Sequence, residues 1–306
     1  MTSFIIRRTL QVIPVLFAIA ILVFGMLHFI PGDPARLVVG IEASKETVEA
    51  ARENLGLNNP IYIQFLTFIG NALQGDLGTS IQTGIPVTEE LATRFPITIT
   101  IALGATIFAT VFGMLGGVLA AIKQNKFTDN FIMFISLIAV SIPSYFLGLI
   151  LLMIFSLKLG WFPVFGVDSP KHYILPIVTL GAQSMGLIAR MTRSSMLDVV
   201  RQDYIRTAKA KGLPERVITY IHALKNALIP VVTVIGLRFG GLLAGTILTE
   251  VVFSIPGVGR YMVDAILARD YPIVQGTILV VATTFVIINI FVDIAYKIVD
   301  PRIRYE

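Results

Sequence analysis

The sequence predicts an all-α, polytopic membrane protein with six transmembrane helices. Its 306 residues are 55% hydrophobic and only 14% charged, with a mean hydropathy of +0.82. Soluble domains carry about 25% charged residues, so a soluble fold is excluded. Six apolar stretches approach the roughly 20 residues that a spanning helix needs. The net charge of +5 comes from basic residues beside these stretches, which indicates membrane orientation rather than nucleic-acid binding.

The first span is expected at about residues 10–30. Arg7 and Arg8 precede it, as in a secretory signal. The apolar run is longer than the 7–15 residues or so of a signal peptide and lacks a small-residue cleavage site, so we expect a retained helix. The fourth span is the least regular, because it is short and contains Gln183. The other five spans are expected at 97–122, 130–157, 173–190, 229–252 and 274–298.

An even number of spans places both termini on one side of the membrane. The N-terminal side carries 15 Lys and Arg residues and the opposite side 8, with Arg238 inside a span. The positive-inside rule therefore predicts a cytoplasmic membrane protein with both termini in the cytoplasm. The expected parts are residues 1–96 (first helix and extracytoplasmic segment), 97–298 (a five-helix core) and 299–306 (a short cytoplasmic tail).

The small extracytoplasmic segment, residues 32–96, is expected to hold its own helices. Ser44 is placed to cap a helix that ends at Gly56. The apolar stretch 61–73 is too short to span a bilayer. A further short helix is expected over 86–94, starting at a proline.

A basic cytoplasmic loop, residues 203–226, is predicted to form a helix–turn–helix hairpin. Alanines and lysines before Gly212 favour helix, and glycine can end it because it adopts left-handed backbone angles. Pro214 suits the first turn of the next helix. Composition alone leaves an ordinary basic loop as an equal alternative.

The hairpin resembles the EAA loop of ABC importer permeases, the surface on which ATPase subunits dock. In that loop an acidic residue and two small residues are followed by glycine after three further positions. Arg206, Thr207, Ala208 and Gly212 stand at those positions. Arg206 departs from the acidic residue, and Pro230 lies further from the glycine than in the general pattern. Both departures resemble the oligopeptide/dipeptide branch, which also covers nickel permeases.

This resemblance implies the MetI-like fold of type I importer permeases and a di- or oligopeptide substrate, with nickel as the alternative. The implied partners are a second homologous permease, expected to be a different chain, two cytoplasmic ATPases that bind ATP and Mg, and an extracytoplasmic binding protein. By the same resemblance, the loop residues that would meet the ATPase are Arg206, Thr207, Ala208, Gly212, Leu213, Pro214, Glu215 and Arg216.

The chain itself is expected to hold no cofactor, metal or catalytic site. Nowhere is a glycine followed by lysine, so there is no P-loop. Cysteine is absent and the three histidines are far apart. A secondary transporter or channel predicts inverted repeats with paired broken helices or intramembrane ionisable groups for ion coupling, and an intramembrane enzyme predicts a buried catalytic pair. Neither pattern is evident.

Several polar or helix-breaking residues are candidates for the translocation path. The stretch 249–260 resembles the external mouth in the peptide-permease family, although a plain helix-ending turn is the alternative. Arg238 is expected to face a bundle interior or water, either in the path or as a structural arginine. A proline interrupts the third span at 141–146, as a path element or a packing kink. The candidates are Ser141, Ser144, Gln183, Arg238, Glu250, Pro256 and Gly257.

Overall fold

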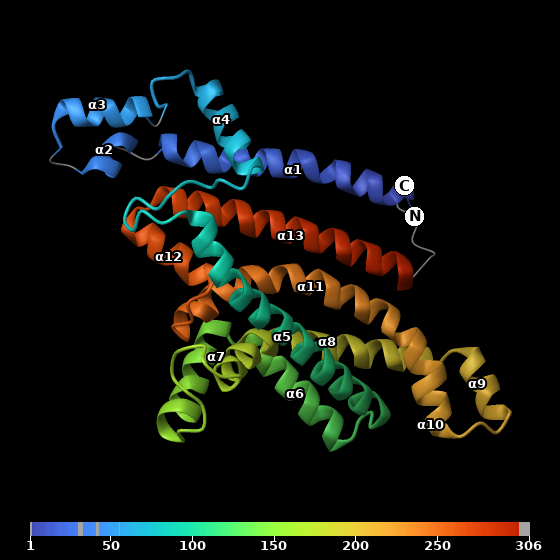
Figure 1. Ribbon diagram of the computed structural model, residues 1–306. Coiled ribbons are helices and arrows are strands. Elements are labelled where there is room, and N and C mark those ends of the chain that lie inside the picture. The colour runs from blue at the N-terminus through green and yellow to red at the C-terminus, as the bar shows by residue number, and fades with distance from the viewer. Residues whose placement is uncertain (1, 30–32, 41–42, 55, 300–306) are drawn as a thin grey trace. The chain divides into compact units, whose positions relative to one another are not determined.

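The computed structural model describes residues 2–29, 33–40, 43–54 and 56–299 (Figure 1). Within these residues the secondary structure is helical, apart from one isolated bridge between Thr79 and Pro86. The chain divides into two compact units. One comprises residues 1–96 and 261–290, and the other comprises residues 97–260 and 291–306. The predicted tail, 299–306, lies outside the described residues except for its first position.

The first unit contains α1 (Thr2–Phe29), α2 (Pro34–Val39), α3 (Lys45–Asn54) and α4 (Ile61–Leu73). The Ser44 hydroxyl accepts the Thr47 N–H at 3.2 Å, which confirms the predicted cap of α3. The apolar stretch 61–73 is the helix α4. Phe65 on α4 packs edge-on against Phe24 on α1, with ring centroids 5.3 Å apart. This short helix is therefore anchored on α1 through aromatic contacts.

A buried aspartate organises the segment before α5. Asp270 is 1% exposed. Its Oδ2 accepts the Ser80 hydroxyl at 2.6 Å and the Gln82 N–H at 3.2 Å.

A cation–π contact joins the start of α5 (Val87–Ile122) to α12 (Val258–Ala268), because the Arg94 guanidinium lies 4.3 Å from the centre of the Tyr261 ring. Burial, reinforced by the Glu90 carboxylate, raises the pKa of Tyr261 to about 12, so this phenol stays neutral.

The second unit is built around α8 (Lys171–Val200), which packs against three neighbouring helices. These are α6 (Phe127–Ser141), α7 (Ser144–Leu151) and α11 (Leu224–Val252). Glycines allow α5 (Val87–Ile122) to approach α8 as well. A Cβ at Gly117 would lie 2.5 Å from the Ala189 carbonyl oxygen. Small residues thus serve close helix packing here, as in other membrane bundles.

The remaining elements of the chain are shorter or lie at its C-terminal end. They are the π-helix η1 (Leu152–Lys158), α9 (Asp203–Ala210), α10 (Glu215–Val217), the π-helix η2 (Ile218–Ala223), α12 (Val258–Ala268) and α13 (Tyr271–Val299).

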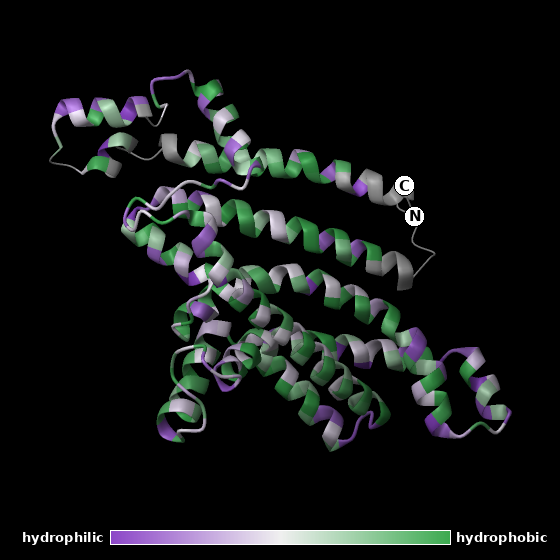
Figure 2. Ribbon diagram, viewed as in Figure 1, coloured by the Kyte–Doolittle hydropathy of each residue, from purple (hydrophilic) through white to green (hydrophobic). Residues whose placement is uncertain are grey.

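Among the residues that the structure describes, four helical stretches are long and apolar enough to cross a membrane. They are Val87–Ile122, Lys171–Val200, Glu215–Val252 and Tyr271–Ile294. The pair α6 and α7–η1 adds a fifth span if it is counted as one. In α1 the apolar part is the shorter stretch Leu10–Met26. The long helices are mainly hydrophobic in Figure 2, whereas α3 is largely hydrophilic. A multi-span helical chain is confirmed, while the number six and the extracytoplasmic placement stay predictions.

Several boundaries differ from those predicted. The expected short helix over 86–94 is the beginning of α5, which continues through Pro96 to Ile122. Prolines are tolerated in spanning helices because neighbouring groups satisfy the freed backbone. The expected span 130–157 is bent by 108°. Ile142 is extended, with φ −82° and ψ 128°, because the residue before a proline is disfavoured in helix.

Candidate functional site

The α9–α10 hairpin extends beyond the neighbouring ends of α8 and α11 (Figure 1). A small apolar core fixes it there. Ile205 on α9 and Ile218 on η2 are 0% and 3% exposed, and both pack with Met196 of α8 and Ala227 of α11. Any force on the hairpin would therefore reach both long helices.

The turn of the hairpin closes as a Schellman motif. Gly212 has φ +74°, and its N–H donates to the Lys209 carbonyl at 2.9 Å. The Leu213 N–H donates to the Ala208 carbonyl at 3.3 Å. These two bonds satisfy carbonyls that the end of α9 would otherwise leave free. Pro214 directly precedes α10 at its N-cap, one position before the predicted first turn.

The predicted docking residues are mostly exposed. Ala208 is the exception, because it is half-buried against the hairpin core. The Arg206 guanidinium lies 3.7 Å from the Asp203 carboxylate, and the two exposed side chains form an ion pair within α9. Large apolar side chains also face outward, with Tyr220 53% and Ile221 60% exposed. The exposed members of the predicted set are Arg206, Thr207, Gly212, Leu213, Pro214, Glu215 and Arg216.

Glu250 is the buried centre of the turn after α11. It is 0% exposed. Its Oε1 accepts the Thr98 hydroxyl at 2.6 Å, and its Oε2 accepts the Arg260 N–H at 3.0 Å. The Gly259 N–H donates to it as well. The carboxylate thus lies at the N-terminus of α12, where a negative charge is favoured.

The turn around Glu250 has room only for glycine. A Cβ at Gly257 would overlap the Glu250 carboxylate, and a Cβ at Gly259 would lie 2.6 Å from Cα of Ile247. The Thr98 hydroxyl accepts the Val258 N–H at 2.9 Å. The stretch with Pro256 and Gly257 is therefore a tight turn locked onto α5 and α11, and a gating role for it stays a prediction.

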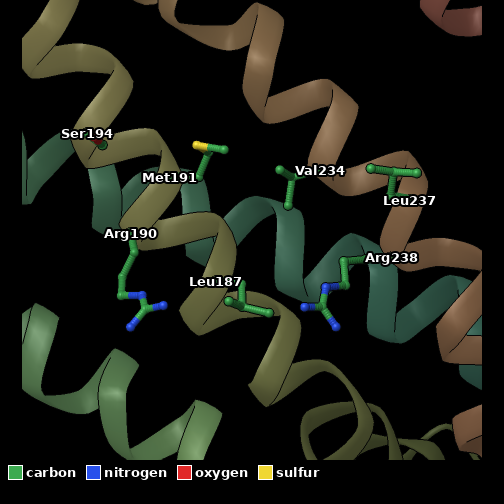
Figure 3. Close-up of a pocket in the computed structure, with 7 residues that line it drawn as sticks. All are labelled: Leu187, Arg190, Met191, Ser194, Val234, Leu237 and Arg238. Carbon is green, nitrogen blue, oxygen red and sulfur yellow. The ribbon is translucent and has the colours of Figure 1, made fainter.

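A pocket of about 450 Å³ opens between α8 and α11 (Figure 3). Arg238, the predicted intramembrane arginine, lines it. The structure also brings Arg190 of α8 to the same pocket, and in Figure 3 both guanidiniums extend to the same side. The full lining is Leu187, Arg190, Met191, Ser194, Val234, Leu237 and Arg238.

Arg190 was not predicted as a site residue from the sequence, because the predicted fourth span ended at this position. α8 continues for ten residues beyond it, to Val200. The missed signal is the spacing of residues 187, 190, 191 and 194, which places them on one face of a helix.

The other path candidates lie at the break between α6 and α7. The Gln183 side chain donates to the Val140 carbonyl at 3.4 Å, close to this break. Ser141 ends α6 and Ser144 begins α7. The structure does not bring these residues to the pocket that Arg238 lines.

An ion pair that the sequence did not predict joins α6 to α8. Asp129 is 1% exposed, and its Oδ1 accepts the Arg193 Nε–H at 2.6 Å. The second oxygen accepts the Arg193 NH2 group at 2.7 Å and the Asn125 N–H at 2.9 Å. The bidentate geometry fixes the first turn of α6 on α8.

Spanning helices packed on a central helix, with an exposed hairpin at their ends, fit the architecture expected of a membrane permease. Residues 113–305 match the family model described as binding-protein-dependent transport system inner membrane component, and residues 1–102 match the model of the N-terminal part of such components. The chain belongs to this family, a family of ABC-importer permeases, and is a multi-pass membrane protein.

Curated relatives match the full length of the chain. It is 46% identical to the glutathione transport system permease protein GsiC of Escherichia coli O6:H1, over 306 residues and 100% of both chains. Identity to the protein of the same name from Escherichia coli K12 is 45%, again over 100% of both.

Solved structures show the fold. The MetNI methionine ABC transporter aligns with a TM-score of 0.55 and 20% identity, over 69% of this chain and 96% of that one. An amino acid ABC transporter aligns with a TM-score of 0.53 and 13% identity, over 71% and 95%. The predicted resemblance to type I importer permeases is confirmed at this level.

Proposed function

We propose that the chain is the permease of an ATP-driven importer that carries di- or oligopeptides, including glutathione-type peptides, across the cytoplasmic membrane by alternating access. The observation that carries this proposal is the exposed α9–α10 hairpin, whose residues 206–212 have the spacing of an ATPase-docking loop. The family membership of the chain supports it. In this proposal the α9–α10 hairpin and both termini of the chain face the cytoplasm.

The hairpin transmits movement of the ATPase subunits to the spanning helices. Two separate ATPase subunits bind ATP and Mg, and one of them receives the exposed tip around Leu213. Closure of the ATPase pair pushes the hairpin. Because Ile205 and Ile218 are packed against α8 and α11, the push moves these helices as rigid bodies. This chain contributes motion and half of the path, and the ATPases contribute the chemistry.

The other half of the path comes from a second homologous permease, a different chain. An extracytoplasmic binding protein delivers the substrate. The names of the relatives, which are glutathione transport system permeases, support a peptide rather than nickel as the cargo. Candidate path elements of this chain are the α6–α7 break, with Ser141, Ser144 and Gln183, and the Pro256–Gly257 turn.

Reconstitution of the complete importer in proteoliposomes tests this proposal. We expect uptake of glutathione or of another tripeptide. This uptake should require ATP on the side of the membrane that holds the ATPases, and it should persist when the ion gradients are collapsed. Uptake without ATP that follows an ion gradient would identify a secondary transporter instead. Uptake of nickel alone would retain the importer mechanism and replace the cargo.

A further inference from the structure

Arg190 and Arg238 form a pair of like charges that lies within the span-length helices. Arg238 is 14 residues from each end of α11, about 21 Å along the helix. Arg190 lies ten residues before the end of α8, about 15 Å from it. Within the part of the chain that the structure describes, neither guanidinium has a hydrogen-bond or ion-pair partner.

Such a pair cannot face hydrocarbon. One arginine near the centre of a span is already costly, and two of the same sign on one pocket repel each other. The other mid-helix arginine of α8, Arg193, shows the contrast, because it is neutralised by Asp129. The pocket side of α8 and α11 must therefore meet water or an anion during the working cycle of the protein.

The walls of the pocket indicate which kind of anion would fit between the two arginines. Leu187, Met191, Val234 and Leu237 provide apolar walls, and Ser194 adds one hydroxyl. Figure 3 shows Leu187 between the two arginine side chains, which extend to the same side. The volume of about 450 Å³ lies within the range of small-molecule sites. A guanidinium matches the planar, two-oxygen geometry of a carboxylate.

We infer that Arg190 and Arg238 form a binding site for the substrate carboxylate in the translocation path. This site selects peptides with a free carboxylate. This inference rests on the proposed importer function and names its cargo class more narrowly. A peptide reaching this depth exchanges the hydration of its carboxylate for guanidinium hydrogen bonds. Its apolar side chains meet the leucine, methionine and valine walls. When the helices move, the pair separates or is rehydrated, and the anion leaves.

The test uses the complete importer in proteoliposomes, with trialanine and trialanine amide as probes. R190Q, R238Q and the double variant remove the charge, R190K and R238K keep it, and R201Q is the control. Arg201 is exposed at the end of α8 and outside the pocket. We expect the double Gln variant to lower free-acid uptake at least about tenfold. Amide uptake should change less than about twofold, because the lost bonds belong to the carboxylate.

Lysine variants and assembly provide readouts that a structural role would not give. R190K and R238K should transport trialanine better than the Gln variants, because an ammonium still pairs with a carboxylate. All variants should copurify with the second permease, and the control R201Q should keep the ATPase activity that the loaded binding protein stimulates.

Three results would overturn the assignment. These are unchanged free-acid uptake in the double Gln variant, Lys variants no better than Gln variants, or loss of the second permease on copurification. The last result would assign the pair to an acid of the partner subunit. Absence of ATP-dependent uptake with the wild-type chain would instead overturn the proposed function, so the two failures are distinguishable.

Discussion

Glu250 shows how one buried carboxylate can hold a turn through hydroxyl and backbone N–H donors. Neutral donors surround it, namely the Thr98 hydroxyl and the N–H groups of Gly259 and Arg260. The sequence placed Glu250 beside a Pro-Gly turn. It could not show that the turn folds back over the carboxylate, because that contact depends on Thr98, 152 residues away.

Replacing Glu250 with alanine should destabilise the protein by about 1–3 kcal/mol, because three buried donors lose their acceptor. Thermal unfolding in detergent measures this as a lower Tm. Glu53, which is exposed on α3, provides the matched control, and E53A should change stability by less than about 0.5 kcal/mol. Equal Tm values for E250A and the wild type would contradict the structural role of Glu250.

Two glycines in spanning helices provide a second residue-scale prediction. G117A places a Cβ 2.5 Å from the Ala189 carbonyl oxygen, so the α5–α8 contact must open, at a cost of about 1–3 kcal/mol. G241A meets no atom within 4 Å and should be neutral or slightly stabilising. The comparison of the two melting curves tests the packing directly. Indistinguishable curves would mean that α5 and α8 are not this close.

At the scale of elements, the turn of the hairpin depends on one backbone conformation. G212P should abolish ATP-driven uptake, because proline cannot adopt φ +74° and removes the N–H that donates to Lys209. G212N is the control, since asparagine tolerates left-handed angles. The membrane level of both variants should match the wild type. Transport at the normal rate by G212P would contradict the docking role of the hairpin.

The Asp129–Arg193 pair connects α6 to α8, and it should behave as a coupled unit. D129N alone leaves Arg193 without its buried partner and should cost on the order of 3 kcal/mol. R193Q alone should cost a similar amount, because it strands a carboxylate that is 1% exposed. A double-mutant cycle of unfolding free energies should give a coupling of at least about 1 kcal/mol. Strict additivity would show that the pair contributes nothing to holding the helices.

At the scale of the whole molecule, composition and apolar runs predicted a multi-span helical protein. Local spacing also predicted the hairpin, because Gly212 and the helix formers before it act within a few residues. Span ends were less predictable. Polar residues such as Arg190 look like loop residues, but α8 continues past them because packing against its neighbours stabilises the helix. The pocket depended on that extension and so was not predicted.

The central claim is that the hairpin is the ATPase-docking surface, and site-specific crosslinking in native membranes tests it most directly. The chain has no cysteine, so L213C and T207C introduce single reactive thiols at exposed positions. K158C, at the opposite end of the predicted third span, is the control. We expect crosslinks from both hairpin positions to an ATP-binding subunit and none from K158C. Hairpin thiols that react with a water-soluble reagent but crosslink to no ATPase would contradict the claim.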